Sequence, residues 1–134
     1  MGKVVVEIYY TGNNYCAHAP ALMGCVSTAT TLDEMKKNIK EAIAFHVETS
    51  LGENNFIPEV FKGDYELEFK ISTEALLNAY SNIFTKAALS RITGINERQL
   101  WHYASGMRKP RPAQRKRIED GLHRLGEELI KIGV

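Results

Sequence analysis

Six acidic side chains in the first seventy residues stand where a metal-dependent nuclease would need carboxylates. A two-metal site holds its cations between several converging carboxylates. The candidates lie on an expected first strand, on a helix and near a later strand: Glu7, Glu34, Glu41, Asp64, Glu66 and Glu68. Glu66 and Glu68, however, alternate with Leu67 and Phe69, which is the pattern of a strand with a solvated face. Since carboxylates are mostly exposed, we expect no metal site and no catalytic residue here.

Cysteine and histidine do not supply a second chemistry. Cys16 and Cys25 are the only cysteines, and neither a C-x-x-C pair nor a Cys/His cluster accompanies them. This pattern favours buried, reduced thiols over a disulfide scaffold or a structural zinc site. His18 and His46 lack neighbouring ligands, so we expect the first on a strand surface and the second on a helix face. No cofactor is implied.

The composition describes a globular chain with two differently charged halves. Its 134 residues, 44% of them hydrophobic, suit one ordinary domain or two small ones. No apolar run approaches a membrane span and the N-terminus lacks a signal-peptide pattern, so we expect a soluble, cytoplasmic protein without a membrane partner. Residues 1–80 hold 6 Lys/Arg and 11 Asp/Glu, a net −5, whereas residues 81–134 hold 11 and 5, a net +6. This asymmetry predicts two modules, the basic one facing a polyanion such as nucleic acid and the acidic one facing a basic surface.

The elements expected in the acidic half form a βββαβ unit. Period-two and β-branched patterns place strands at residues 4–10, 15–19, about 24–29 and 65–71. The Thr11–Asn14 cluster suits a hairpin turn. Thr31 and Glu34 form a capping box that starts a helix, and Gly52 ends its apolar stripe. A helix between the third and fourth strands predicts a mixed α+β sheet with the helix on its inner face.

One segment carries a family resemblance. Residues 19–34 read APALMGCVSTATTLDE, with an aromatic hairpin before them and Ile57-Pro58 after the helix. This run resembles the HicB-like antitoxins over about the first seventy residues, with Met23 where the family usually has Pro and a hairpin turn that lacks the usual acidic residues. The resemblance implies a degenerate RNase H-like fold without nuclease activity. It also implies a small basic partner, a HicA-like mRNA-cleaving toxin.

The basic half is expected to be helical. Helices are predicted at residues 73–80, 85–93 and 97–104. Thr85 and Asn96 suit N-caps and Gly94 closes the middle helix, so the last two helices make a helix-turn-helix. The run ALSRITGINERQLWHYASGMRKP resembles the phage-repressor-like (XRE-type) helix-turn-helix. Apolar positions of this motif pack the helices together, and the exposed positions face DNA.

The resemblance implies DNA contacts for residues at particular places in that motif. The expected base-edge contacts are Glu97, Arg98, Gln99 and His102, with Arg98 toward guanine as the best candidate. The expected phosphate contacts are Thr85, Lys86, Asn96, Arg108, Lys109 and Arg111. Tyr103 is expected in the core. Trp101 stands at a position that is normally exposed, where it would cover phosphate, sugar or a partner chain.

After Pro112 an apolar pattern returns at four- and three-residue steps. It comprises Ile118, Leu122, Leu125, Leu129 and Ile132. This stripe suits packing onto the helix-turn-helix core, with a dimer seam as the alternative. Gly121 and Gly126 weaken a single long helix, and we expect Gly126 to end it, with residues 127–134 in another form that pairs with a second subunit.

Together these patterns predict a binding protein rather than an enzyme. We expect a HicB-like partial RNase H-fold domain at residues 1–71 and a helix-turn-helix DNA-binding domain at residues 72–134. Such an antitoxin would mask its toxin, repress its own operon at operator DNA, and form a homodimer or higher even oligomer. The alternative is a stand-alone helix-turn-helix transcriptional regulator whose N-terminal domain binds a ligand or dimerises. A divalent-metal nuclease is the third class, and it requires Glu7 and Asp64 for cleavage.

Overall fold

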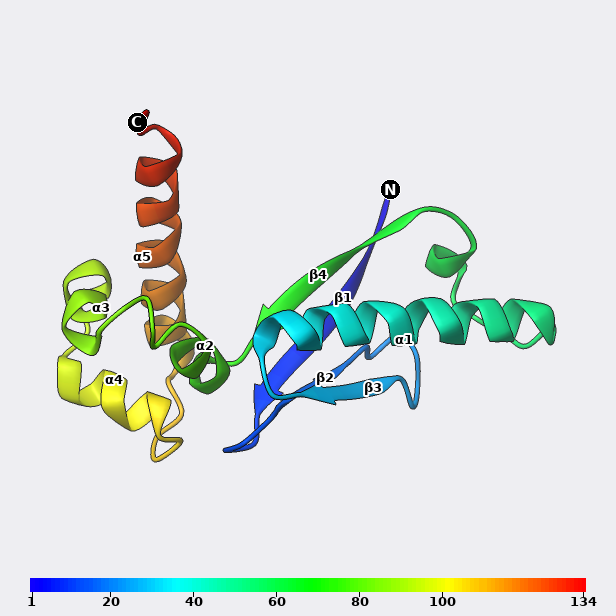
Figure 1. Cartoon of the computed structure of the whole chain (residues 1–134), viewed down its shortest axis with the longest axis horizontal. Coiled ribbons are helices and arrows are strands. Elements are labelled where there is room, and N and C mark those ends of the chain that lie inside the picture. Colours follow the sequence, from blue (N-terminus) through cyan, green and yellow to red (C-terminus); the bar gives the residue numbers. More distant parts are fainter. The chain divides into compact units, whose positions relative to one another are not determined.

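The computed structural model describes all 134 residues and has a four-stranded mixed sheet and five α-helices (Figure 1). The predicted α+β class with a mixed sheet is confirmed. The chain divides into two compact units, Met1–Ala75 and Leu76–Val134. The assignment of domain types to residues 1–71 and 72–134 stays a prediction. None of the helices has the length and apolar character that crossing a membrane requires.

The sheet of the first unit has the strand order β3-β2-β1-β4. Its strands are β1 (Gly2–Tyr10), β2 (Tyr15–His18), β3 (Val26–Ala29) and β4 (Tyr65–Ile71). β1 pairs antiparallel with β2 and parallel with β4, and a parallel neighbour requires a crossover, which α1 (Leu32–Gly52) supplies. Gly12 turns the β1–β2 hairpin with a φ of +91°. β3 begins later than the expected Gly24 because the Cys25 N–H is bonded to the Leu22 carbonyl in the preceding turn.

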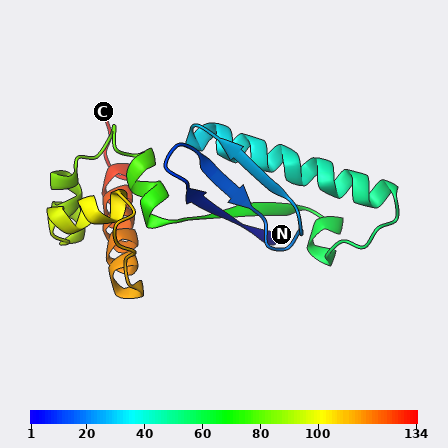
Figure 2. The same ribbon diagram turned by 90° about the horizontal axis from the view of Figure 1, so that it is seen from below.

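Helix α1 covers one face of this sheet (Figure 2). It begins where the capping pattern predicts, since the Thr31 hydroxyl accepts from the Glu34 N–H at 3.2 Å. Met35, Ile39 and Ile43 on its inner stripe are completely buried. The alternate β1 residues Val4, Val6 and Ile8 are buried on the sheet. Each such side chain contributes about 1.5–3 kcal/mol through removal from water, so the stripe and the strand together form the core of the unit.

A short 3-10 turn, Glu59–Lys62, lies between α1 and β4. It buries Phe61, whose ring meets the Tyr65 ring edge-on with 5.2 Å between centroids. The outward residues of β4 alternate with half-buried ones, as the period-two pattern predicts.

The second unit is helical. Its elements are α3 (Lys86–Thr93), α4 (Glu97–Ala104), α5 (Pro112–Ile130) and the end of α2 (Thr73–Ala79), which spans the boundary between the units. Six buried side chains form its core: Leu77, Leu89, Ile95, Leu100, Tyr103 and Ile118. The expected burial of Tyr103 is therefore confirmed.

The C-terminal helix differs from the expectation in two ways. It continues through Gly126 to Ile130, so the prediction that Gly126 ends it is wrong. Gly121 allows close packing, because a Cβ there would lie 2.8 Å from the Ile92 carbonyl oxygen of α3. The apolar stripe joins the core only in part, since Ile118 is buried whereas Leu129 and Ile132 are more than half exposed.

Candidate functional site

Helices α3 and α4 are joined by a tight turn with well-defined caps. The Thr85 hydroxyl accepts from the Ala88 N–H at 3.0 Å and starts α3. Gly94 ends that helix in the left-handed region with a φ of +73°. Asn96 starts α4 by accepting from the Arg98 N–H at 2.8 Å. Each of these residues was predicted from the sequence, because caps depend on neighbours only a few residues away.

The four residues expected at base edges all lie on α4, at two different depths. Glu97 and Arg98 are exposed in its first turn, whereas Gln99 and His102 are half-buried. The Gln99 Nε2 donates to the Tyr103 hydroxyl at 3.0 Å, which holds the amide against the core. The Nδ1 atom of His102 is buried without a hydrogen-bond partner. The most accessible side chains of the set are therefore those of Glu97 and Arg98.

Two neighbouring hollows bring together residues from α4, the segment after it and α5. The first, of about 490 Å³, is lined by Gln99, Tyr103, Arg108, Lys109, Arg111 and Gln114. The second, of about 420 Å³, is lined by Gly94, Ile95, Asn96, Arg98, Gln99, His102, Gln114 and Arg117. Because Gln99 and Gln114 line both, the two hollows form one continuous polar surface, which we call the α4 surface. Thr85 and Lys86 line neither hollow.

Four cations of the α4 surface are available to a ligand. Arg98, Arg108, Lys109 and Arg111 are all exposed. The ion pairs of the chain, His18–Glu7, Lys62–Glu59 and Lys116–Asp120, engage none of them. Positive charge without an internal partner in a concave surface attracts anions.

Lys86 has a different environment from the other expected phosphate contacts. It is 7% exposed, and its ammonium lies 4.6 Å from the centroid of the Trp101 ring. Trp101 itself is 57% exposed. The sequence did not predict this cation–π contact, because the two residues belong to different helices.

Arg117 and Gln114 are members of the α4 surface that the sequence did not single out. Arg117 donates through Nη2 to the Gly94 carbonyl at 2.8 Å and through Nη1 to Gln114 Oε1 at 3.1 Å. It thereby ties α5 to the turn between α3 and α4. The basic run at residues 115–117 was the available signal, but only the packing of α5 shows which member of the run faces the turn.

The first unit presents a second candidate surface, on the sheet face opposite α1. Directly opposite each other in the β1–β2 register, Glu7 and His18 approach to 3.3 Å between Oε2 and Nε2. The Tyr9 hydroxyl donates to the same Glu7 oxygen at 2.7 Å, and the Tyr9 ring stacks on His18 with centroids 5.6 Å apart. The hydrogen bond to Glu7 raises the pKa of Tyr9 above its usual value. We call this trio the Glu7 cluster.

Charged and apolar side chains surround the Glu7 cluster. On β4 the outward residues are Glu66, Glu68 and Lys70, and on β3 Val26 stands opposite His18 with 66% of its surface exposed. Although carboxylates are frequent here, no group of three or more His, Cys, Asp or Glu side chains is placed to hold a metal ion. Both cysteines are free, and burial raises the pKa of the Cys25 thiol.

Comparison with known proteins identifies the first unit. The family model described as "HicB_like antitoxin of bacterial toxin-antitoxin system" matches residues 3–78, more than half of the chain. The match begins in β1 and ends in α2. Neither a curated protein nor a solved structure matches the chain.

Proposed function

The chain belongs to the HicB-like antitoxins of bacterial toxin–antitoxin systems, and we propose that it neutralises a small basic HicA-like mRNA interferase and represses its own operon. The family match is the observation that carries this proposal. The family is regulatory rather than catalytic. We assign the first unit a degenerate RNase H-like fold without nuclease activity.

The toxin is proposed to bind the sheet face that carries the Glu7 cluster. Residues 1–80 have a net charge of −5, which attracts a basic protein over long range and speeds encounter. At short range, the stacked Tyr9 and His18 rings and the exposed Val26 supply contact area of the kind found at the centre of protein interfaces. Glu66 and Glu68 on β4 supply carboxylates for Lys and Arg of the toxin.

Operator DNA is proposed to bind the α4 surface of the second unit. We interpret this unit as an XRE-type helix-turn-helix that places α4 in the major groove. There Arg98 reaches guanine, and the neighbouring base edges are faced by Glu97, Gln99 and His102. Arg108, Lys109 and Arg111 then contact phosphates after α4, while Thr85, Asn96 and Lys86 lie at helix starts, whose dipoles favour phosphate. Two copies would place their α4 helices about one DNA turn apart on a near-palindromic site.

Co-expression tests the proposal. The chain is expressed with and without the product of any small reading frame adjacent to its gene, and growth, copurification and binding to the upstream DNA are measured. Arrest of growth by the small protein alone, with rescue and a stable complex on co-expression, supports the antitoxin function. No toxicity and no complex, with DNA binding retained, would favour the stand-alone regulator instead.

A further inference from the structure

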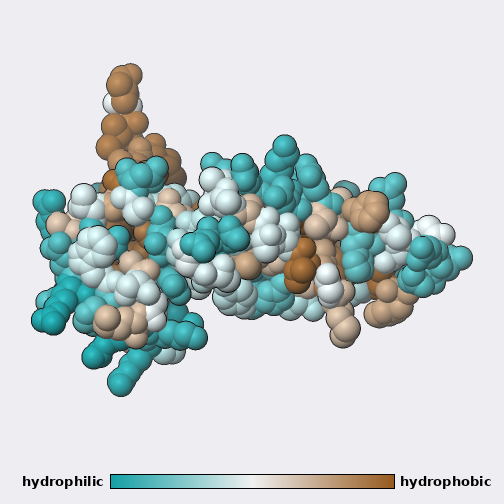
Figure 3. Space-filling model, turned by 60° about the horizontal axis from the view of Figure 1, so that its bottom comes forward, coloured by the Kyte–Doolittle hydropathy of each residue, from teal (hydrophilic) through white to brown (hydrophobic).

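The end of α5 exposes an apolar segment, residues 129–134, which we call the tail. Its hydrophobic members are Leu129, Ile130, Ile132 and Val134, each more than half exposed. Figure 3 shows them as a brown column at the end of the chain. Contiguous exposed apolar side chains of this kind mark a surface that another surface covers.

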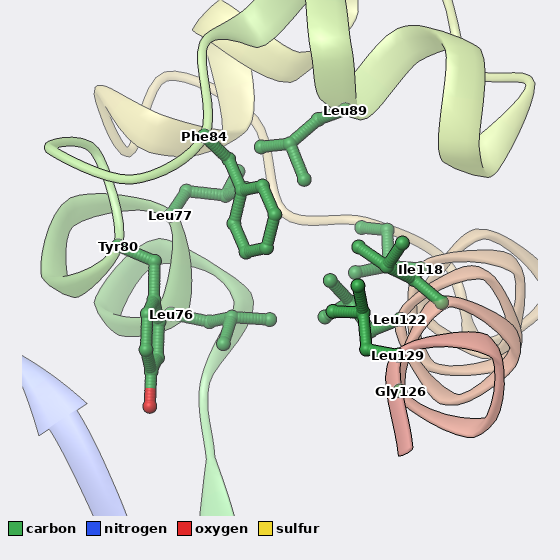
Figure 4. A pocket seen from close by; sticks show the side chains of 10 residues that line it. Leu76, Leu77, Tyr80, Phe84, Leu89, Ile118, Leu122, Gly126 and Leu129 are labelled. Atoms are coloured by element: carbon green, nitrogen blue, oxygen red, sulfur yellow. The ribbon is translucent and has the colours of Figure 1, made fainter. Parts of the chain in front are cut away.

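An apolar groove opens beside the tail. It has a volume of about 290 Å³ and runs between α2 and Phe84 on one side and α5 on the other, with Leu89 of α3 at one end (Figure 4). Leu76, Tyr80, Phe84, Leu122, Leu125 and Leu129 are among its lining residues, and none of the lining residues is charged. The groove is therefore complementary in polarity to the tail.

The tail does not fill the groove of its own copy. Leu129 lines the groove but is still 54% exposed, and Ile130 is 85% exposed. Successive residues of a helix differ by about 100° in direction, so Ile130 cannot face the groove while Leu129 does. Because α5 is helical through Ile130, its last turn needs a second apolar surface.

Charge favours a second copy as the source of that surface. Residues 81–126 carry 10 Lys/Arg and 3 Asp/Glu, a net +7, whereas residues 127–134 carry Glu127, Glu128 and Lys131, a net −1. Glu127 and Glu128, which directly precede the tail, thus make the end of α5 the acidic part of a basic unit, and they are attracted to the basic unit of another copy. A basic toxin would instead be repelled by the groove's surroundings.

We infer that two copies of the chain associate through their second units by reciprocal exchange, the tail of each copy entering the groove of the other. Leu129 belongs to both surfaces, so a single two-fold axis brings each tail to the partner's groove. The inference names the surface of the proposed dimer and needs neither toxin nor DNA.

Two variants of the full chain separate the two halves of the exchange. Gly126→Phe fills the groove, and its Cβ meets no atom within 4 Å, so the fold of its own copy has room for it. The double variant Ile130→Ser, Ile132→Ser removes apolar surface from the tail, without adding charge, at positions that are exposed in one copy. Ile83→Ser is the matched control, because Ile83 is 65% exposed in the same unit but does not line the groove.

Sedimentation equilibrium without DNA or toxin measures the outcome, with circular dichroism to verify folding. Wild type and Ile83→Ser should be dimers, and each of the two other variants should dimerise at least tenfold more weakly. Mixing the groove variant with the tail variant leaves one intact tail and one intact groove, so the mixture should associate more tightly than either variant alone. A monomeric wild type, or variants that dimerise as wild type does, would overturn the inference while leaving antitoxin activity and operator binding to their own tests.

Discussion

The ammonium of Lys86 at the start of α3 lies 4.6 Å from the centroid of the Trp101 ring on α4. The contact joins α3 to α4, the helix that carries the proposed base contacts. Trp101 therefore packs against Lys86 within the second unit, while 57% of its surface stays exposed.

A first prediction concerns the stability that this contact supplies. Trp101→Ala should lower the free energy of unfolding by about 1–2 kcal/mol, since a desolvated cation–π pair is worth up to about 2 kcal/mol. Trp101→Phe, which keeps an aromatic face, should lose less. Urea unfolding of Trp101→Ala, of Lys86→Met and of the double variant that combines them gives the coupling energy between the two side chains. A coupling energy near zero would show that the ring and the ammonium act independently.

Base recognition and phosphate contact should respond differently to substitution. Arg98→Ala should cost about 1–3 kcal/mol on the operator and relax base preference at one position. Lys109→Ala should weaken binding to all sequences alike and lower the slope of log affinity against log salt by about one. Titrations of operator and scrambled DNA at several salt concentrations distinguish the two effects. Uniform weakening by both variants would contradict the proposed docking of α4.

The two interior glycines of α5 should respond to alanine with opposite signs. At Gly126 a Cβ meets no atom within 4 Å, so Gly126→Ala should stabilise the chain by about 1 kcal/mol through helix propensity. At Gly121 the Cβ would lie 2.8 Å from the Ile92 carbonyl oxygen, so overpacking should outweigh propensity and Gly121→Ala should destabilise by about 1–2 kcal/mol. Thermal and urea unfolding measure both. Stabilisation by Gly121→Ala would mean that α3 and α5 are not packed this closely.

Charge reversal on the sheet tests the proposed toxin surface. Glu68 is exposed on β4, on the face that carries the Glu7 cluster, and Glu48 is exposed on α1. Glu68→Lys and Glu48→Lys change the net charge equally, so any difference between them reports position. Toxin binding should weaken at least tenfold more for Glu68→Lys than for Glu48→Lys, measured by calorimetry at low salt. Equal losses would indicate long-range attraction alone and would remove the sheet face as the binding surface.

Local patterns predicted most of the helices and strands, because the interactions that form them join residues that are close together in the sequence. Thr31, Thr85 and Asn96 each accept from a backbone N–H two or three residues ahead, and these bonds start α1, α3 and α4. The alternation in β4 follows in the same way from the geometry of a single strand. The prediction that Gly126 ends α5 was wrong because a glycine only lowers local helix propensity. Neighbouring turns and packing decide whether the helix continues.

The α+β class, the two oppositely charged halves and the family of the first half could all be predicted from the amino-acid sequence, because charge, periodicity and the run around Gly24 can be read along the chain. Which distant residues meet could be seen only in the folded chain. Arg117 on Gly94, Lys86 on Trp101 and Tyr9 on His18 are contacts between separate elements. The apolar groove beside the tail likewise depends on packing, because α2, α3 and α5 all contribute residues to its lining. Such contacts depend on how helices and strands pack in three dimensions, and the spacing of residues along the chain does not predict which residues of separate elements come together.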